Sequence, residues 1–152
     1  MDIFRGTDVP SMPGASAKPN WGQLLSAPIQ VLIADDSEAI RRAIRLLLQS
    51  ESMLIAGELA SFTELVATLS SMKPDVVLMD LHMPGEDQAD KVKEHMQGTC
   101  LIAMSLWDDA ETQYLAKDFG AARLLNKSTL ATTLVDAIHE CTRKPRNATA
   151  QI

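Results

Sequence analysis

The sequence predicts an α/β fold, a doubly wound parallel sheet of five strands with five helices in a single domain. Short apolar runs rich in β-branched residues, such as residues 75–79, are bounded by turn formers and are typical of strands buried on both faces. Segments with apolar residues at helical spacing alternate with these runs, which favours βαβ units with right-handed crossovers. Polar residues stand at the carboxyl ends of several of these runs, which is where parallel sheets carry their ligand-binding sites.

The elements follow one another without a break from residue 30 onward. The predicted strands are residues 30–34, 53–58, 75–79, 100–104 and 121–125. The predicted helices are one capped by Ser37, then residues 61–72, 86–97 and 109–119, and a last one capped by Ser128 or Thr129. In the first helix the arginines fall mostly on the face opposite the apolar stripe. In the last helix, a buried stripe is predicted from Leu130, Leu134, Ala137, Ile138 and Cys141. The order of the strands in the sheet does not follow from the sequence.

The ends of the chain carry little periodic apolar signal. Prolines and glycines punctuate residues 1–28, which we interpret as a flexible N-terminal extension. Trp21, Leu24 and Leu25 form either a short docking turn or part of an unstructured leader. The domain itself is predicted over residues 29–142, and residues 143–152 are a C-terminal tail or a truncated linker.

Composition narrows the class of protein. The 152 residues carry a net charge of −6, which argues against a general nucleic-acid-binding surface. No apolar run reaches the roughly 18 residues of a membrane span, and no secretory signal is present. The expected location is therefore the cytoplasm. Cys100 and Cys141 show no metal or redox spacing, so both are expected to be reduced, packed thiols.

Five polar residues lie at the carboxyl ends of predicted strands and should meet at one edge of the sheet. They are Asp35, Asp36, Asp80, Ser105 and Lys127. Each alone is typical of a turn or a helix cap. Together, three carboxylates repel one another unless a cation lies among them, and hard oxygen ligands suit Mg²⁺. A carboxylate can act as a nucleophile toward phosphorus, and a lysine and a hydroxyl can neutralise and contact a phosphoryl group.

Four motifs carry a resemblance to a known family: VLIADDSEAI, PDVVLMDLHMPG, LIAMS and GAARLLNKS. They resemble the receiver domain of bacterial two-component response regulators over about residues 29–142. The resemblance implies the flavodoxin-like fold and a phosphoacceptor at Asp80, served by a histidine kinase or a histidine phosphotransfer protein. It implies Mg²⁺ held by Asp36, Asp80 and the backbone carbonyl of His82, with Asp35 acting through water. It also implies that Ser105 and Lys127 bind the phosphoryl oxygens.

Three positions around this site depart from the family pattern, and one of them is Ser128, which replaces the proline usual after the lysine. Leu124 stands where the family usually has a tyrosine or phenylalanine, the aromatic residue of the common switch. Leu106 is bulky where a small residue is usual, so it is expected to narrow access to Asp80. Trp107, close to Ser105 in sequence, is the candidate for a substitute moving aromatic residue.

Several functions remain open at this point. A stand-alone receiver would signal through the face made by the fourth helix, the fifth strand and the fifth helix, to a protein partner or a second copy. The chain could instead be the receiver half of a helix-turn-helix transcription regulator, or a degenerate receiver that only binds proteins. A metal-dependent phosphatase using Asp80 is disfavoured, because it needs a nearby general acid and the residue two positions later is His82. We expect no turnover enzyme, no membrane contact and no nucleic-acid contact within this chain.

Overall fold

The computed structural model of the protein describes residues 27–143, and five parallel strands form its only sheet over that range. The strands lie in the order β2-β1-β3-β4-β5, so β3 is central and β2 and β5 are the edges. Every neighbouring pair is parallel, and the predicted doubly wound, flavodoxin-like fold is confirmed. The strands are β1 (Ile29–Ala34), β2 (Met53–Leu59), β3 (Val76–Asp80), β4 (Cys100–Ser105) and β5 (Arg123–Asn126).

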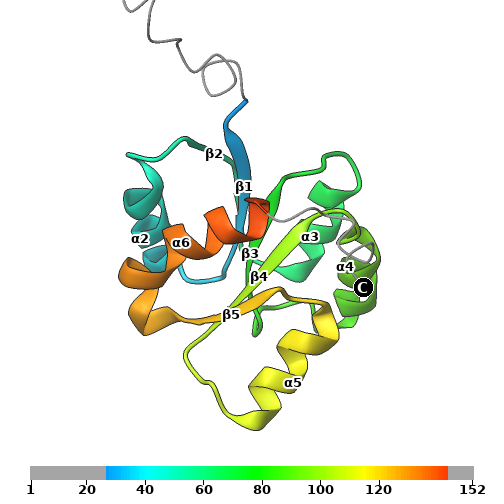
Figure 1. Ribbon diagram of the computed structural model, residues 1–152. Coiled ribbons are helices and arrows are strands. Elements are labelled where there is room, and N and C mark those ends of the chain that lie inside the picture. Colours follow the sequence, from blue (N-terminus) through cyan, green and yellow to red (C-terminus); the bar gives the residue numbers. More distant parts are fainter. Residues whose placement is uncertain (1–26, 144–152) are drawn as a thin grey trace, which may run out of the picture.

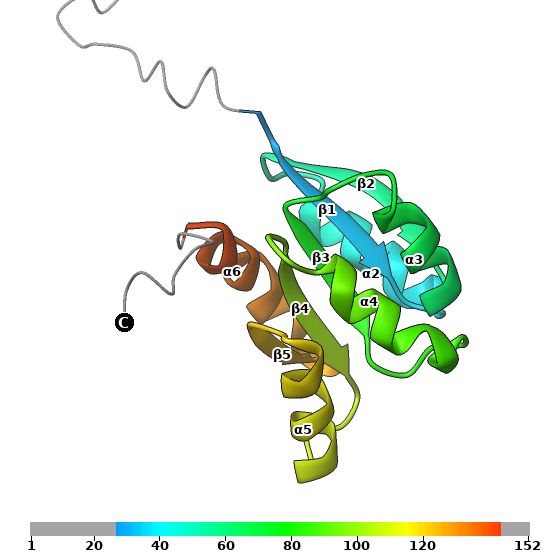
Figure 2. The ribbon, with the colours of Figure 1, turned by 90° about the vertical axis from the view of Figure 1, so that its right-hand side faces the viewer.

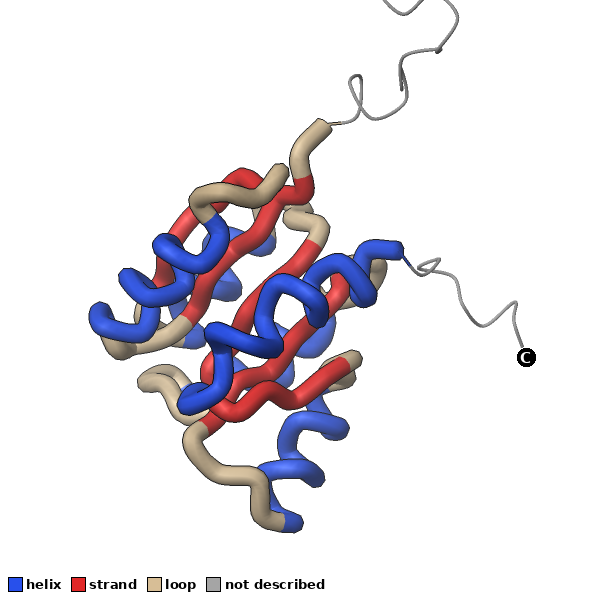
Figure 3. Tube along the Cα trace, turned by 60° about the vertical axis from the view of Figure 1, so that its left-hand side comes forward, coloured by secondary structure: helices blue, strands red, loops and turns tan. Residues whose placement is uncertain are grey.

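Helices cover both faces of this sheet. They are α2 (Glu38–Leu48), α3 (Phe62–Leu69), α4 (Ala89–His95), α5 (Ala110–Phe119) and α6 (Leu130–Arg143), with short 3₁₀ turns η2 (Glu86–Gln88) and η3 (Lys127–Thr129). Helices α2 and α6 lie on one side of the sheet and α3, α4 and α5 on the other (Figure 1). Figure 2 shows the face covered by α3, α4 and α5, and Figure 3 shows α6 lying across the strands on the opposite face.

Strand β3 shows why the apolar runs of the sequence form a sheet buried on both faces. All five of its residues are buried. Val77 and Met79 point into the core beneath α3, α4 and α5, whereas Val76 and Leu78 point into the core beneath α2 and α6. A strand in contact with helices on both faces must be apolar throughout, because its side chains alternate between the two cores.

Helix ends follow the capping residues in most places. The Ser37 side chain accepts a hydrogen bond from the N–H of Ile40, and Gly120 ends α5 in the left-handed conformation with φ 86°. The predicted cap of the last helix at Ser128 or Thr129 is wrong. Asn126 Oδ1 accepts from the N–H of Ser128 instead, because the chain first makes the 3₁₀ turn η3.

The third predicted helix, over residues 86–97, is shorter than the pattern indicates. It divides into η2 and α4, and it ends at His95. Gly85, with φ 91°, sets the entry to this segment, and Val92 is its only buried residue up to His95. The helix ends with Met96, which is buried, at its C-cap position.

The two cysteines are joined, contrary to the expectation of reduced thiols. Cys100 and Cys141 form a disulfide with their Cα atoms 6.1 Å apart and a sequence separation of 41 residues. The sequence does not reveal this pairing because it depends on α6 crossing the sheet back to the first residue of β4. Cys141 is otherwise placed as predicted, since it lies on the buried stripe of α6.

The predictions for residues 1–26 and 144–152, including the docking turn of Trp21, Leu24 and Leu25, concern segments outside the described residues. Within residues 27–143, no helix has the length and apolar character needed to cross a membrane.

Candidate functional site

The fold brings the five predicted polar residues together at the carboxyl end of the sheet. Asp35 follows β1, Asp80 ends β3, Ser105 ends β4 and Lys127 follows β5. Because β1 and β4 both pair with β3 in parallel, their carboxyl ends lie on either side of Asp80. The site therefore arises from the strand order, as expected for a doubly wound sheet.

Three carboxylates form the centre of this site. One oxygen from each of Asp35, Asp36 and Asp80 lies within 4.8 Å of the others. Asp35 and Asp80 are buried, with 0% and 3% exposure, whereas Asp36 is exposed. The group is thus open to solvent on the Asp36 side and closed on the side of the core.

Lys127 is the basic residue of the group. Its Nζ lies 2.7 Å from Asp35 Oδ2 and 3.3 Å from Asp80 Oδ2, and its side chain is only 9% exposed. Among the described residues Asp35 Oδ2 has no hydrogen-bond partner, and its contact with Lys127 Nζ at 2.7 Å is an ion pair. One ammonium facing three carboxylates leaves two negative charges uncompensated, which is the charge of one divalent cation.

Backbone N–H groups orient the two buried carboxylates. Asp35 Oδ1 accepts from the N–H of Ser37 at 2.8 Å, and Asp80 Oδ1 accepts from the N–H of His82 at 3.0 Å. Each Asp is therefore fixed by the residue two positions later, a turn that local sequence dictates. The second oxygen of each carboxylate is left to face Lys127.

Burial raises the pKa of the Asp80 carboxyl to about 6. The negative charge of Asp35 also contributes to this rise, while the hydrogen bond from the His82 N–H and the Lys127 ammonium limit it. The charged form of Asp80 is thus costly in the metal-free protein. A cation beside it would favour the charged form, which is the form able to act as a nucleophile.

Ser105 and Trp107 form the wall of the site on the β4 side. Ser105 is buried, and its Oγ accepts a hydrogen bond from the N–H of Trp107 at 3.1 Å. The Trp107 ring is 57% exposed and meets the His82 ring edge-on, with 5.7 Å between ring centroids. The cleft above Asp80 has a volume of about 390 Å³. Its lining comprises Asp36, Ser37, Ile40, Asp80, His82, Ser105, Leu106, Trp107 and Lys127.

Two of the departures from the family pattern, Leu106 and Leu124, lie in different surroundings. Leu106 lines the cleft, as its predicted effect on access requires, and is 58% exposed. Leu124 is partly buried against the core beneath α3, α4 and α5, and it pairs with Ala103 of β4. The aliphatic side chain of Leu124 packs against this core and has no polar group that could form a hydrogen bond.

Sequence reasoning missed the role of Arg41 at the edge of the site. Its guanidinium donates to the backbone carbonyl of Asp35 at 2.7 Å and to Glu58 Oε1 at 3.3 Å. Arg45 also pairs with Glu58, at 2.6 Å. The arginine face of α2 therefore does not simply face solvent: it holds α2 against β2. The one hint in the sequence was Glu58, an acidic residue in the second predicted strand. Its pairing with the arginines depends on how α2 packs beside that strand.

The donor set suits a hard divalent cation. Carboxylate oxygens are the ligands that Mg²⁺ prefers, and the exposed Asp36 leaves room for the waters that Mg²⁺ retains. No thiol or imidazole belongs to the carboxylate group. The site is therefore consistent with a magnesium site and unlike a zinc site.

Fold and site together define a signalling module of the two-component systems, and comparison with known proteins agrees. The chain belongs to the response regulator receiver domain family, whose model matches residues 31–139. Receiver domains of this family are signalling modules and not turnover enzymes.

Individual relatives show the same relationship. Over 119 residues the chain is 30% identical to an uncharacterized transcriptional regulatory protein, YxjL, of Bacillus subtilis, covering 76% of this chain and 55% of the relative. It is also 30% identical to the response regulator protein VraR of Staphylococcus aureus, covering 76% and 57%. The chain thus spans just over half the length of these relatives.

A solved structure agrees in detail with the fold. The signal receiver domain of the putative response regulator NarL from Mycobacterium tuberculosis matches with a TM-score of 0.71 and 26% identity. The match covers 79% of this chain and all of that one. The response regulator domain of Thermotoga maritima CheB, with a TM-score of 0.68 and 24% identity over 78% and 98% of the two chains, supports the fold.

Proposed function

We propose that this domain is a phosphoacceptor receiver in which Asp80 takes a phosphoryl group from a histidine kinase or a histidine phosphotransfer protein. The observation that carries the proposal is the arrangement of a buried carboxylate beside two further carboxylates and one ammonium. In the transfer, an Asp80 oxygen forms a bond to phosphorus as the bond from phosphorus to the donor's imidazole nitrogen breaks. The product is an aspartyl phosphate.

The proposed metal ligands are Asp36, Asp80 and the backbone carbonyl of His82, with Asp35 acting through water. Bound there, Mg²⁺ would supply neutralisation of the charge on the transferring phosphoryl group. The chain's own residues do the rest. Lys127 would pair with a phosphoryl oxygen, a role supported by its contacts to Asp35 and Asp80. The Ser105 hydroxyl would contact the phosphoryl group from the end of β4, the strand beside β3.

The state of the domain would be communicated through the loop after β4. In this structure the Trp107 N–H donates a hydrogen bond to Ser105 Oγ. A Ser105 hydroxyl that turns toward a phosphoryl group gives up this bond, which frees the loop and separates the Trp107 ring from His82. Trp107 would thus take the part of the aromatic residue that Leu124 replaces.

Tryptophan fluorescence tests this switch. In a Trp21→Phe background, Trp107 is the one remaining tryptophan of the chain. Adding Mg²⁺ and beryllofluoride, a phosphoryl mimic, is expected to change its emission. No change on binding of the mimic would contradict a role for Trp107. Trp107→Ala is expected to blunt the conformational response, measured by hydrogen exchange of α5.

The output is proposed to pass through the face formed by α5, β5 and α6, to a protein partner or a second copy. Tyr114 of α5 is 70% exposed, and the Arg123–Glu140 ion pair joins β5 to α6 at 2.6 Å. Size-exclusion chromatography with and without beryllofluoride tests self-association. A shift that Tyr114→Ala abolishes would support a homodimer, and an unchanged elution volume would favour a different partner.

Phosphorylation itself is tested by mass spectrometry of the full chain after incubation with acetyl phosphate and Mg²⁺. The wild type should gain the mass of one phosphoryl group, and Asp80→Asn should not. Asp87→Asn, which alters an exposed aspartate outside the cleft, is the matched control and should react like the wild type. No gain by the folded wild type would contradict the proposal and leave a receiver fold that only binds proteins.

A second candidate is that this receiver serves a DNA-binding transcription regulator. It is favoured by the relative that carries the name of a transcriptional regulatory protein and by the chain spanning 55% of that relative's length. A reading frame that continues past Ile152 into a helix-turn-helix would support it. A stop codon directly after Ile152 would favour the stand-alone receiver.

A further inference from the structure

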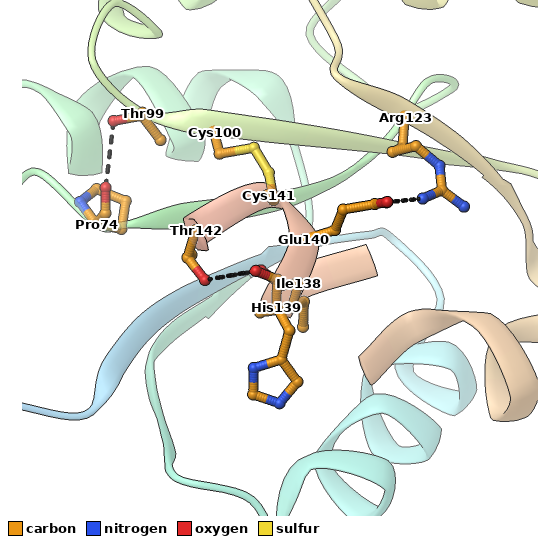
Figure 4. The surroundings of a disulfide bond; sticks show 9 residues. All are labelled: Pro74, Thr99, Cys100, Arg123, Ile138, His139, Glu140, Cys141 and Thr142. Atoms are coloured by element: carbon orange, nitrogen blue, oxygen red, sulfur yellow. Dashed lines mark hydrogen bonds and ion pairs between the residues drawn. A yellow bond between two sulfur atoms is a disulfide. The ribbon is translucent and has the colours of Figure 1, made fainter. Parts of the chain in front are cut away.

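The disulfide between Cys100 and Cys141 lies at the amino-terminal end of β4, whereas the cleft above Asp80 lies at the carboxyl end of the strands. Cys100 is the first residue of β4, and Ser105, which reaches the cleft, is the last. Cys141 lies in the last turn of α6 (Figure 4). A change at this bond therefore acts on the far end of α6, away from Asp80.

The disulfide is the most buried link between the last turn of α6 and the sheet. Cys141 is 8% exposed and is the last buried residue of the helix as far as Arg143. The other attachments of that turn are ion pairs at the surface. Glu140 pairs with Arg123 at 2.6 Å, with side chains 49% and 43% exposed, and His139 lies 3.7 Å from Glu51. Exposed pairs of this kind contribute little, so the disulfide carries most of the attachment.

The fold does not depend on this bond. Helix α6 is already packed on the sheet through Leu134, Ala137 and Ile138, all of them fully buried. Two large cores surround the sheet, whereas the domains that need disulfides are small ones that cannot bury enough apolar surface. Reduction should therefore leave a folded domain in which two small thiols still pack against each other.

The two sulfurs differ in their surroundings. Cys100 is partly exposed, whereas Cys141 is buried. Cys141 also lies at the carboxyl end of a helix, where the helix dipole disfavours a thiolate. Cys100 is thus the cysteine that an outside thiol or disulfide reaches first, and Cys141 is the one that resolves the intermediate.

We propose that Cys100 and Cys141 form a reversible redox site, exchanging with small thiols and disulfides, whose state sets the order of the last turn of α6. In the oxidising direction, the Cys100 thiolate attacks a small-molecule disulfide of the glutathione type. A mixed disulfide forms and one small thiolate leaves. The Cys141 thiolate then attacks the Cys100 sulfur and releases the second small thiolate. The protein gives up two electrons and two protons overall, and the small disulfide becomes two thiols.

This input is separate from phosphorylation. Within the described residues, none of the groups around the bond in Figure 4 belongs to the cleft at Asp80. The last turn of α6 instead borders the face where α6 and β5 are joined by Arg123 and Glu140. Oxidation would therefore act on the geometry of that face.

A redox titration of the full wild-type chain tests the first part of the proposal. The protein is equilibrated in buffers with different ratios of reduced to oxidised glutathione, quenched with acid, and labelled with N-ethylmaleimide for intact mass analysis. Two labels are expected at the reducing end and none at the oxidising end, with the same curve from both directions and unchanged circular dichroism. A pair that stays oxidised at every ratio would overturn reversibility, and a pair that stays reduced at every ratio would overturn the site.

Hydrogen exchange tests the second part without any substitution. Amides of residues 139–143 are expected to exchange at least several-fold faster in the reduced wild type than in the oxidised one, while amides of β3 stay unchanged. Equal rates at residues 139–143 in the two states would overturn the proposal. The double variant Cys100→Ser with Cys141→Ser is the control. It should resemble the reduced wild type and ignore the glutathione ratio, and a response to that ratio would place the effect elsewhere and overturn the assignment.

Discussion

Replacing Asp80 by asparagine should stabilise the metal-free protein at neutral pH. The raised pKa of Asp80 means that its charged form is disfavoured in the folded state, mainly because the carboxylate is buried. Asparagine keeps the shape of the side chain without the charge. It also leaves Lys127 with Asp35, its closer partner at 2.7 Å.

The size of this gain follows from the pKa. A rise from 3.8 to about 6 corresponds to about 3 kcal/mol of unfolding free energy, as an order of magnitude. Because the folded state holds the proton more tightly than the unfolded state, the wild type loses stability as the pH rises from 3.8 to about 6. The advantage of Asp80→Asn should therefore be full above about pH 7, fall to roughly half near pH 5, and vanish below pH 3.8.

Urea unfolding in the presence of EDTA, at several pH values, measures this gain. Asp36→Asn is the matched control, because it removes the same charge from the exposed member of the carboxylate group and should give a smaller gain. An Asp80→Asn variant no more stable than the wild type at pH 7.5 would refute the reasoning, as would a gain that is independent of pH. Added Mg²⁺ should stabilise the wild type more than the variant.

Further predictions concern the scaffold of the site and use urea unfolding at neutral pH. Phe62→Ala removes a fully buried ring stacked on another phenylalanine and should cost about 3–5 kcal/mol; a cost below about 1 kcal/mol would contradict its place in the core. Gly85→Ala should destabilise more than Gly120→Ala. Both have positive φ, but a Cβ at Gly85 would lie 2.7 Å from Thr63 Oγ1 and one at Gly120 would meet nothing within 4 Å, so equal costs would be inconsistent with this packing. Asp109→Ala removes the N-cap of α5 and should cost about 1 kcal/mol; no loss would show that the cap contributes nothing.

The fold could be predicted from the sequence because each signal is local. The apolar run of β3, the Ser37 cap and the stripe of α6 all depend on residues close together in the chain. The order of the strands could not be predicted, since it depends on which strand edges meet. The predicted cap at Ser128 failed because the Ser128 hydroxyl donates to Asn126 Oδ1, and Asn126 caps the 3₁₀ turn that precedes the helix.

The grouping of the five polar residues could be predicted because each lies at the end of a strand or within two residues after it. Parallel pairing brings such residues to the same end of the sheet, and the order of the strands then decides which of them become neighbours. The contacts that escaped prediction join elements through helix packing. The bond from Cys100 to Cys141 and the pairing of Arg41 with Glu58 both require knowledge of where a helix lies on the sheet.

The central claim is that the carboxylates hold a divalent cation next to the reactive Asp80. Anomalous diffraction from crystals soaked in Mn²⁺, a close substitute for Mg²⁺, measures this directly. We expect a peak within ligand distance of carboxylate oxygens of Asp36 and Asp80. A map without a peak at saturating Mn²⁺, with Lys127 still the sole counter-charge of the buried pair, would contradict it.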